Sequence, residues 1–210
     1  YQCDWSSDVC SSDLLGMLEE YFIVQGSEWE RDAWIKARVI NQHRVQTADQ
    51  LAISVRNLYD VVRPFVYRRY LDFNVLAALR DLHSQIRQEA VRRQMSRESH
   101  MGGETDPVDI KLGHGGIREI EFLVQTQQLI LGGRDHRLRG RETLAMLDQL
   151  AENDWIEKQA KHELETSYLF LRDVEHRIQM IADEQKHTLP NDDEGIANIG
   201  RMMGFIDHTD

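Results

Sequence analysis

Apolar residues recur at intervals of three and four along most of the chain, which is the spacing of one buried helix face. In the segment 47–62, for example, Leu51, Val55 and Leu58 fall on one stripe. The pattern predicts helices over residues 15–39, 47–62, 70–95, 116–131, 141–152, 156–185 and 195–204. The expected fold class is therefore mainly α, a bundle of long helices with at most one or two short strands.

Local signals refine the helix boundaries. Ser27 can cap a second helix within residues 15–39, because Glu30 stands three residues later in the capping-box position. Pro64 is expected to allow only a turn or a new start after the helix over 47–62. Residues 96–108 are polar and contain glycines and a proline, so they predict a loop, and residues 108–112 are a candidate short strand.

Composition limits the classes of protein to which the chain can belong. Its 210 residues, 41% of them hydrophobic, suffice for one large domain or one and a half small ones. The formal net charge of -11 repels phosphate backbones, so we expect no general nucleic-acid binding. No apolar run approaches the length of a membrane span, so we expect no membrane partner.

The first residues differ from the rest of the chain. Residues 1–14 are rich in Ser and Asp, lack helical periodicity and resemble the translated reading frame of a sequencing-library adapter. We therefore expect residues 1–14 to be unstructured and residues 15–210 to be the folded part. Both cysteines, Cys3 and Cys10, lie in the adapter-like segment. The remainder has no disulfide framework, as expected for a protein of the reducing cytoplasm.

The stretch DIKLGHGGIREIEFLVQ, residues 109–125, places three glycines before a charged helix start. One interpretation is structural: a glycine turn, a pair between Arg118 and Glu121, and a carboxylate at Glu119 that favours the helix N-terminus. The buried face of this helix is then predicted to consist of Ile117, Ile120, Leu123, Val124, Gln127, Ile130 and Leu131.

A functional interpretation of the same stretch is equally open. Glycines let the backbone approach a phosphate, and the free N–H groups of the following helix would point at it. Lys111 and Arg118 would add positive charge, and a glutamate could reach a metal ion. The spacing matches neither a Walker A loop nor a dinucleotide fingerprint.

Other charged blocks carry weaker signals. In SEWERDAWIKAR, residues 27–38, Arg31 and Arg38 share a helix stripe, which suits an anionic ligand or a buried carboxylate; a solvated face is the alternative. RPFVYRRYLD, residues 63–72, is either a nucleotide clamp or a salt-bridged interface. RDVEHRIQMIADEQKHTLP, residues 172–190, has no recognised zinc spacing and is interpreted as a polar seam of the bundle.

Four blocks together resemble the family of bifunctional glutamine synthetase adenylyltransferase/adenylyl-removing enzymes. They are QGSEWERDAWIKARVI, RPFVYRRYLDF, DIKLGHGGIREIEFLVQTQQLILGGRDHRLR and LRDVEHRIQMIADEQKHTLP, and the similarity covers about residues 15–205. The R-E-I-E form of the third block is specific to the N-terminal, adenylyl-removing half of these enzymes. The resemblance therefore implies that residues 15–210 are the helical part of that domain, truncated at both ends.

The resemblance implies a nucleotidyltransferase-type enzyme that removes AMP from a tyrosine of glutamine synthetase by phosphorolysis, while its other half adds AMP. Implied cofactors and ligands are Mg²⁺, AMP, ADP and ATP. The paired Asp ligands of the metal belong to a Gly-Ser-Asp-x-Asp segment that this chain lacks, so we expect them upstream and expect the chain alone to be inactive.

Candidate site residues follow from the matching blocks. The expected catalytic residues are Arg118, Glu119 and Glu121. The expected nucleotide- or phosphate-binding residues are Lys111, Gly113, Gly115, Gly116, Arg31, Lys36 and Arg38. The expected partners are glutamine synthetase and a PII-type signalling protein. An alternative is a non-catalytic helical module that docks one of these two proteins.

Overall fold

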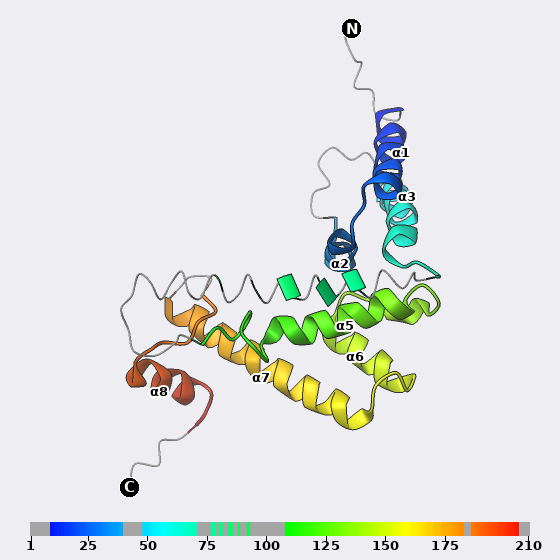
Figure 1. The fold of residues 1–210 in the computed structure, drawn as a ribbon. Helices are drawn as coiled ribbons and strands as arrows, with labels where there is room; N and C mark the ends of the chain where they lie inside the picture. The colour runs from blue at the N-terminus through cyan, green and yellow to red at the C-terminus, as the bar shows by residue number, and fades with distance from the viewer. Residues whose placement is uncertain are drawn as a thin grey trace, which may run out of the picture. The chain divides into compact units, whose positions relative to one another are not determined.

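The computed structural model describes residues 9–39, 48–70, 108–182 and 186–205, and single positions between 77 and 92 (Figure 1). The chain forms two compact units. Unit 1 comprises residues 1–79 and 125–141, and unit 2 comprises residues 80–124 and 142–210. Helix α5 (Ile117–Leu131) contributes residues to both units.

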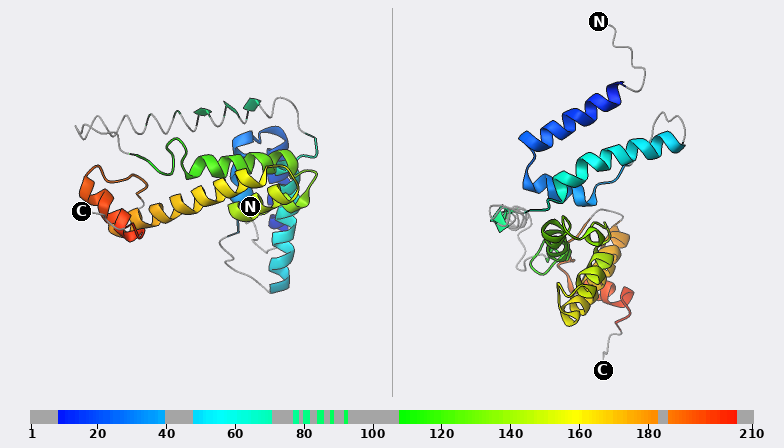
Figure 2. Two further views of the ribbon diagram at one scale, coloured as in Figure 1. Left: turned by 90° about the horizontal axis from the view of Figure 1, so that it is seen from below. Right: turned by 90° about the vertical axis from the view of Figure 1, so that its right-hand side faces the viewer.

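Unit 1 contains α1 (Val9–Val24), α2 (Glu28–Lys36), α3 (Ala48–Val66), the second half of α5 and a short 3-10 helix, η1 (His136–Leu138). Helices α1 and α2 both pack against α3 (Figure 2). The centre of the unit is aromatic, since the rings of Phe22 and Phe65 stack with centroids 4.0 Å apart. The buried apolar residues of this core are Phe22, Ile35, Val62, Phe65, Val66 and Leu129.

Unit 2 contains the first half of α5, α6 (Thr143–Glu152), α7 (Lys158–Ala182) and α8 (Asp193–Met202). The long helix α7 packs against α6 and against α8. Two separate apolar clusters result. One consists of Ile110, Val174, Ile178 and Ile199, and the other of Val124, Met146 and Leu147.

Several predicted features are confirmed. The fold is mainly α, and the described residues contain an isolated bridge but no strand. The carboxylate of Glu30 accepts hydrogen bonds from the backbone N–H and the hydroxyl of Ser27, as the capping box predicted. Helix α5 ends at the two glycines, where the N–H of Gly132 donates to the carbonyl of Gln128. The expected helix over 70–95 and the expected loop over 96–108 lie mainly outside the described residues.

Three expectations about boundaries are wrong. Helix α3 runs through Pro64 to Val66, because buried side chains at 62, 65 and 66 hold its last turn in the core. Residues 108–112 form no strand, because the Asp109 carboxylate accepts from the N–H groups of Lys111 and Leu112 and turns the chain after one bridge. Helix α1 begins at Val9, so residues 9–14 are helical: an established helix extends easily into preceding residues.

The predicted buried face of α5 is also partly wrong. Leu123 is 38% exposed, whereas Gln125 and Gln128 are buried. Gln128 can be buried because its side-chain amide donates to the carbonyls of Leu138 and Gly140. The predicted face did not include Gln125 or Gln128, and the hydrogen bonds of Gln128 explain why that residue can be buried.

Candidate functional site

The glycine turn before α5 is held by its own backbone. The N–H of Gly113 donates to the carbonyl of Asp109, and the N–H of Gly116 donates to that of Gly113. Gly115 has a φ of 74°, a left-handed conformation that glycine adopts without strain. A Cβ at Gly116 would lie 2.8 Å from the carbonyl oxygen of Ile110, so this position too requires a glycine.

The first N–H groups of α5 are directed into this turn. The N–H of Ile117 donates to the carbonyl of Ile110, and that of Arg118 to the carbonyl of Lys111, each at 3.0 Å. The N–H of Gly115 donates to the carboxylate of Glu119 at 3.1 Å. The expectation that these donors are free to bind a phosphate is therefore wrong: the turn folds back on the helix start and satisfies them.

Arg118 and Glu121 pair as predicted, and α7 adds a third member to the pair. The guanidinium of Arg118 lies 3.4 Å from one carboxylate oxygen of Glu121. The hydroxyl of Tyr168 donates to the other oxygen at 3.2 Å. Burial raises the pKa of Tyr168, so the phenol stays protonated and can donate this hydrogen bond to the carboxylate. The arrangement holds one cationic and one acidic group, both partly exposed, at the first turns of α5.

Lys111 reaches a buried carboxylate, that of Glu175 on α7, whose side chain is only 3% exposed. The Nζ of Lys111 lies 3.2 Å from Glu175 Oε1, and a nitrogen of Arg172 lies 2.6 Å from Oε2. The Nδ1 of His187 is 2.9 Å from Oε1, without the alignment of a hydrogen bond. Two obligate cations thus neutralise one buried carboxylate, which is the arrangement that burial of a charge requires.

Backbone pairing completes this connection. The N–H of Ile110 donates to the carbonyl of His187, and the N–H of Leu189 donates to that of Val108. The sequence pattern indicates only a polar seam of the bundle for residues 172–190, and it gives no sign of their contact with the glycine turn. Glu175 and His187 are the members of this site that sequence reasoning missed, and no local spacing signal could have found them.

Arg31, in unit 1, is fully buried. Its Nε donates to the carbonyl of Phe65, and one terminal nitrogen donates to that of Val66, both at 2.9 Å. The other terminal nitrogen pairs with the carboxylate of Glu28, one helical turn earlier in α2. Burial lowers the pKa of Arg31, although the carboxylate of Glu28 opposes this effect. The structure therefore assigns Arg31 to the packing of α2 against the end of α3.

The other two cations of the same block lie at or beyond the end of α2. The Nζ of Lys36 donates to the carbonyl of Arg141, and Arg38 is exposed. Both residues belong to unit 1, whereas Lys111, Arg118, Glu119 and Glu121 belong to unit 2.

A sequence model of the family described as GlnD PII-uridylyltransferase matches residues 80–210, which is more than half of the chain. The chain belongs to this family. It is 50% identical over 200 residues to the bifunctional glutamine synthetase adenylyltransferase/adenylyl-removing enzyme of Ralstonia nicotianae, and the alignment covers 93% of this chain and 21% of that protein. The resemblance predicted from the four blocks is thereby confirmed.

Two further relatives carry the same name. The bifunctional enzymes of Brucella melitensis and Nitrosomonas eutropha are 47% and 44% identical, over 92% and 93% of this chain and 18% and 19% of their own lengths. The chain thus spans about a fifth of the length of the curated relatives it matches.

The described residues do not fit a Mg²⁺ site. They include no group of three or more His, Cys, Asp or Glu side chains placed to hold a metal ion. Glu121 is engaged by Arg118 and Tyr168, and Glu119 accepts from the N–H of Gly115. These two carboxylates are therefore not assigned to a metal. Nor is any helix in the described part of the chain long and apolar enough to cross a membrane.

Proposed function

We propose that this chain is a helical segment of an enzyme that controls glutamine synthetase by removing AMP from one of its tyrosines and, in another half, adding it. The observation that supports this proposal is the identity of 44–50% to bifunctional enzymes of that name over more than nine-tenths of the chain. AMP, ADP and ATP are the nucleotides that such an enzyme handles, and glutamine synthetase is the proposed partner.

We assign the segment to the deadenylylating half. The support is the R-E-I-E form of the block at 118–121, which begins α5. In the proposed phosphorolysis, an oxygen of inorganic phosphate attacks the phosphorus of the AMP–tyrosine ester. The bond from phosphorus to the tyrosine oxygen breaks, ADP leaves, and the tyrosine oxygen takes up a proton. Negative charge is spread over the oxygens in the transition state, so positioned cations lower the barrier.

The side chains have separate roles in this proposal. Arg118 supplies positive charge, and the hydrogen-bonded carboxylate of Glu121 orients it. Glu119 fixes the glycine turn through the N–H of Gly115. Lys111 is proposed to add positive charge to the site, because the single carboxylate of Glu175 cannot cancel both Lys111 and Arg172. In unit 1, Lys36 and Arg38 are proposed as nucleotide contacts, whereas Arg31 acts through packing. Mg²⁺ is proposed to be held upstream of this chain.

The test uses a full-length enzyme that carries this segment. Arg118→Ala and Glu121→Gln should each lower the rate of deadenylylation at least tenfold, or about 1.4 kcal/mol of transition-state stabilisation, while adenylylation changes little. Phosphate-dependent ADP release measures the first reaction, and AMP incorporation into glutamine synthetase measures the second. Arg177→Ala is the matched control, because Arg177 forms a similar exposed pair with Asp173 on α7.

The outcomes separate the candidate functions. Loss of adenylylation alone would place the segment in the other half. Variants that keep both activities but bind glutamine synthetase more weakly would favour the alternative, a non-catalytic docking module. The 210-residue chain by itself should release no ADP from adenylylated glutamine synthetase, because the paired metal carboxylates are expected upstream. Measurable release would contradict that expectation.

A further inference from the structure

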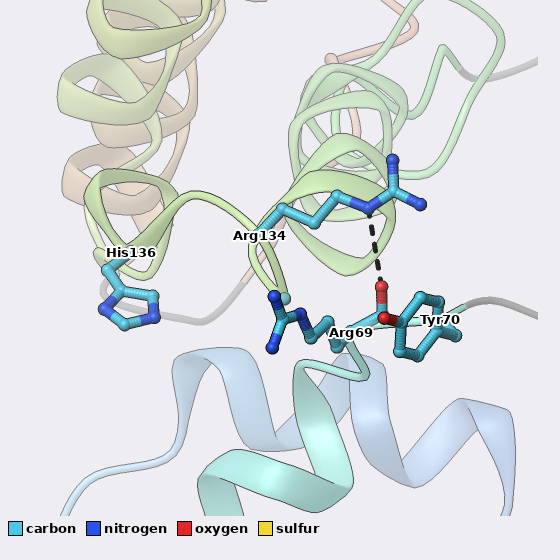
Figure 3. Close-up of a pocket in the computed structure, with 5 residues that line it drawn as sticks. Arg69, Tyr70, Arg134 and His136 are labelled. Atoms are coloured by element: carbon cyan, nitrogen blue, oxygen red, sulfur yellow. Dashed lines mark hydrogen bonds between the residues drawn. The ribbon is translucent and has the colours of Figure 1, made fainter.

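A cationic pocket lies in unit 1, between the end of α3 and the turn that follows α5. It has a volume of about 700 Å³ and is lined by Arg69, Tyr70, Gly133, Arg134 and His136. Figure 3 shows the Arg69 side chain pointing toward His136, and the Arg134 side chain reaching over the carbonyl of Arg69 beside Tyr70. The Nε of Arg134 donates to that carbonyl at 3.4 Å.

The charge of this pocket is unbalanced. Two guanidinium groups and an imidazole line it, and none of the described lining residues is acidic. Asp135 follows Arg134 in the chain, but its carboxylate is occupied by Arg137 in a two-point pair, with distances of 2.9 and 2.8 Å. The acidic group closest in sequence is therefore neutralised by an arginine that does not line the pocket.

The backbone carbonyls at the C-terminal end of α5 already accept hydrogen bonds. The N–H groups of Arg134 and Asp135 both donate to the carbonyl of Leu131, and Arg139 donates to the carbonyl of Gly132 at 2.6 Å. The last carbonyls of a helix carry partial negative charge, which disfavours an anion nearby. Because the carbonyls of Leu131 and Gly132 already accept these hydrogen bonds, they repel a bound anion less.

The turn that follows α5 lies close against the segment that follows α3. A Cβ at Gly133 would overlap the carbonyl of Arg68, so only glycine lets residues 133–134 lie against residues 68–69. This contact brings together Arg69 and Arg134, which are far apart in the sequence. The ring of Tyr70 is exposed, with the guanidinium of Arg69 6.0 Å from its centroid.

We propose that this pocket binds the phosphate groups of a small phosphorylated ligand, either a nucleotide or free inorganic phosphate. Guanidinium groups bind phosphate oxygens through paired N–H donors, and an exposed aromatic ring can stack on a base. The pocket volume lies within the range of small-molecule sites, about 300–1,000 Å³. The inference is independent of the proposed function, because none of Arg118, Glu119 and Glu121 lines the pocket.

The test measures binding of inorganic phosphate, ADP and adenosine to the whole 210-residue chain by calorimetry. Arg69→Gln and Arg134→Gln should each weaken phosphate or ADP binding at least tenfold. Arg63→Gln is the matched control: it removes the same charge from an exposed position of α3 that does not line the pocket, and it should change the dissociation constant less than twofold. Thermal melting of each variant separates loss of the site from loss of the fold.

Each result either supports or overturns the proposal, and the supporting results also identify the ligand. Phosphate and ADP binding with equal affinity identifies a phosphate site, and tighter ADP binding identifies a nucleotide site; both support the proposal. It is overturned if adenosine binds as tightly as ADP, if Arg63→Gln weakens binding as much as Arg69→Gln, or if neither anion binds at millimolar concentration. An Arg69→Gln variant that melts like the wild type and still binds ADP normally would also overturn it.

Discussion

Replacing Arg31 with methionine should strongly destabilise unit 1. The α3 helix ends at Val66, and the last carbonyls of a helix have no partner within it. The buried guanidinium of Arg31 satisfies two of them, at Phe65 and Val66, across 34 and 35 residues of sequence. Methionine fills much of the same space but donates no hydrogen bond.

The magnitude follows from the groups left without partners. Each buried carbonyl that loses its donor costs about 1–3 kcal/mol. Loss of the pair with Glu28 adds about 0–1 kcal/mol, because Glu28 is partly exposed and keeps Arg68 at 3.7 Å. The total is about 2–7 kcal/mol, a large share of the roughly 5–15 kcal/mol that stabilises a typical domain. Arg31→Lys should cost less, because an ammonium can still serve one of the two carbonyls.

Urea denaturation, followed by circular dichroism and tryptophan fluorescence, measures this change. Arg38→Met is the matched control, since it makes the same substitution at an exposed site two residues beyond α2 and should cost at most about 0.5 kcal/mol. The reasoning is refuted if Arg31→Met lowers the free energy of unfolding by less than about 1 kcal/mol, or if Arg38→Met costs as much.

Two further predictions concern unit 1. Gly133→Ala should lower the melting temperature because the new Cβ would overlap the backbone carbonyl of Arg68, whereas Gly16→Ala, which meets no atom within 4 Å inside α1, should raise it slightly; equal effects would contradict this. The hydrogen bond from Tyr21 lowers the pKa of Glu30 below its ordinary 4.5. The ionised carboxylate therefore adds stability above pH 4.5 that is lost as the pH falls through the lowered pKa. Tyr21→Phe should reduce this acid sensitivity, measured as the change in urea midpoint between about pH 6 and about pH 3.5; an unchanged difference would argue against the bond.

Much of the secondary structure could be predicted from the sequence, because its signals are local. A helix face repeats every three to four residues, the Glu30 carboxylate reaches Ser27 within one turn, and two glycines end α5 at Gly132. The pair between Arg118 and Glu121 is local in the same sense, and it was predicted correctly.

Only the tertiary structure decided which charged groups are buried and which donors remain free. Arg31 gave the same sequence signal as Arg38, yet one is buried beneath the end of α3 and the other is exposed. Lys111 pairs with Glu175, which lies much later in the chain, on α7. The backbone N–H groups that were expected to bind a phosphate donate instead to carbonyls of the glycine turn. The physical reason is that the fate of a charge depends on desolvation and on partners that only folding brings together, and spacing along the chain records neither.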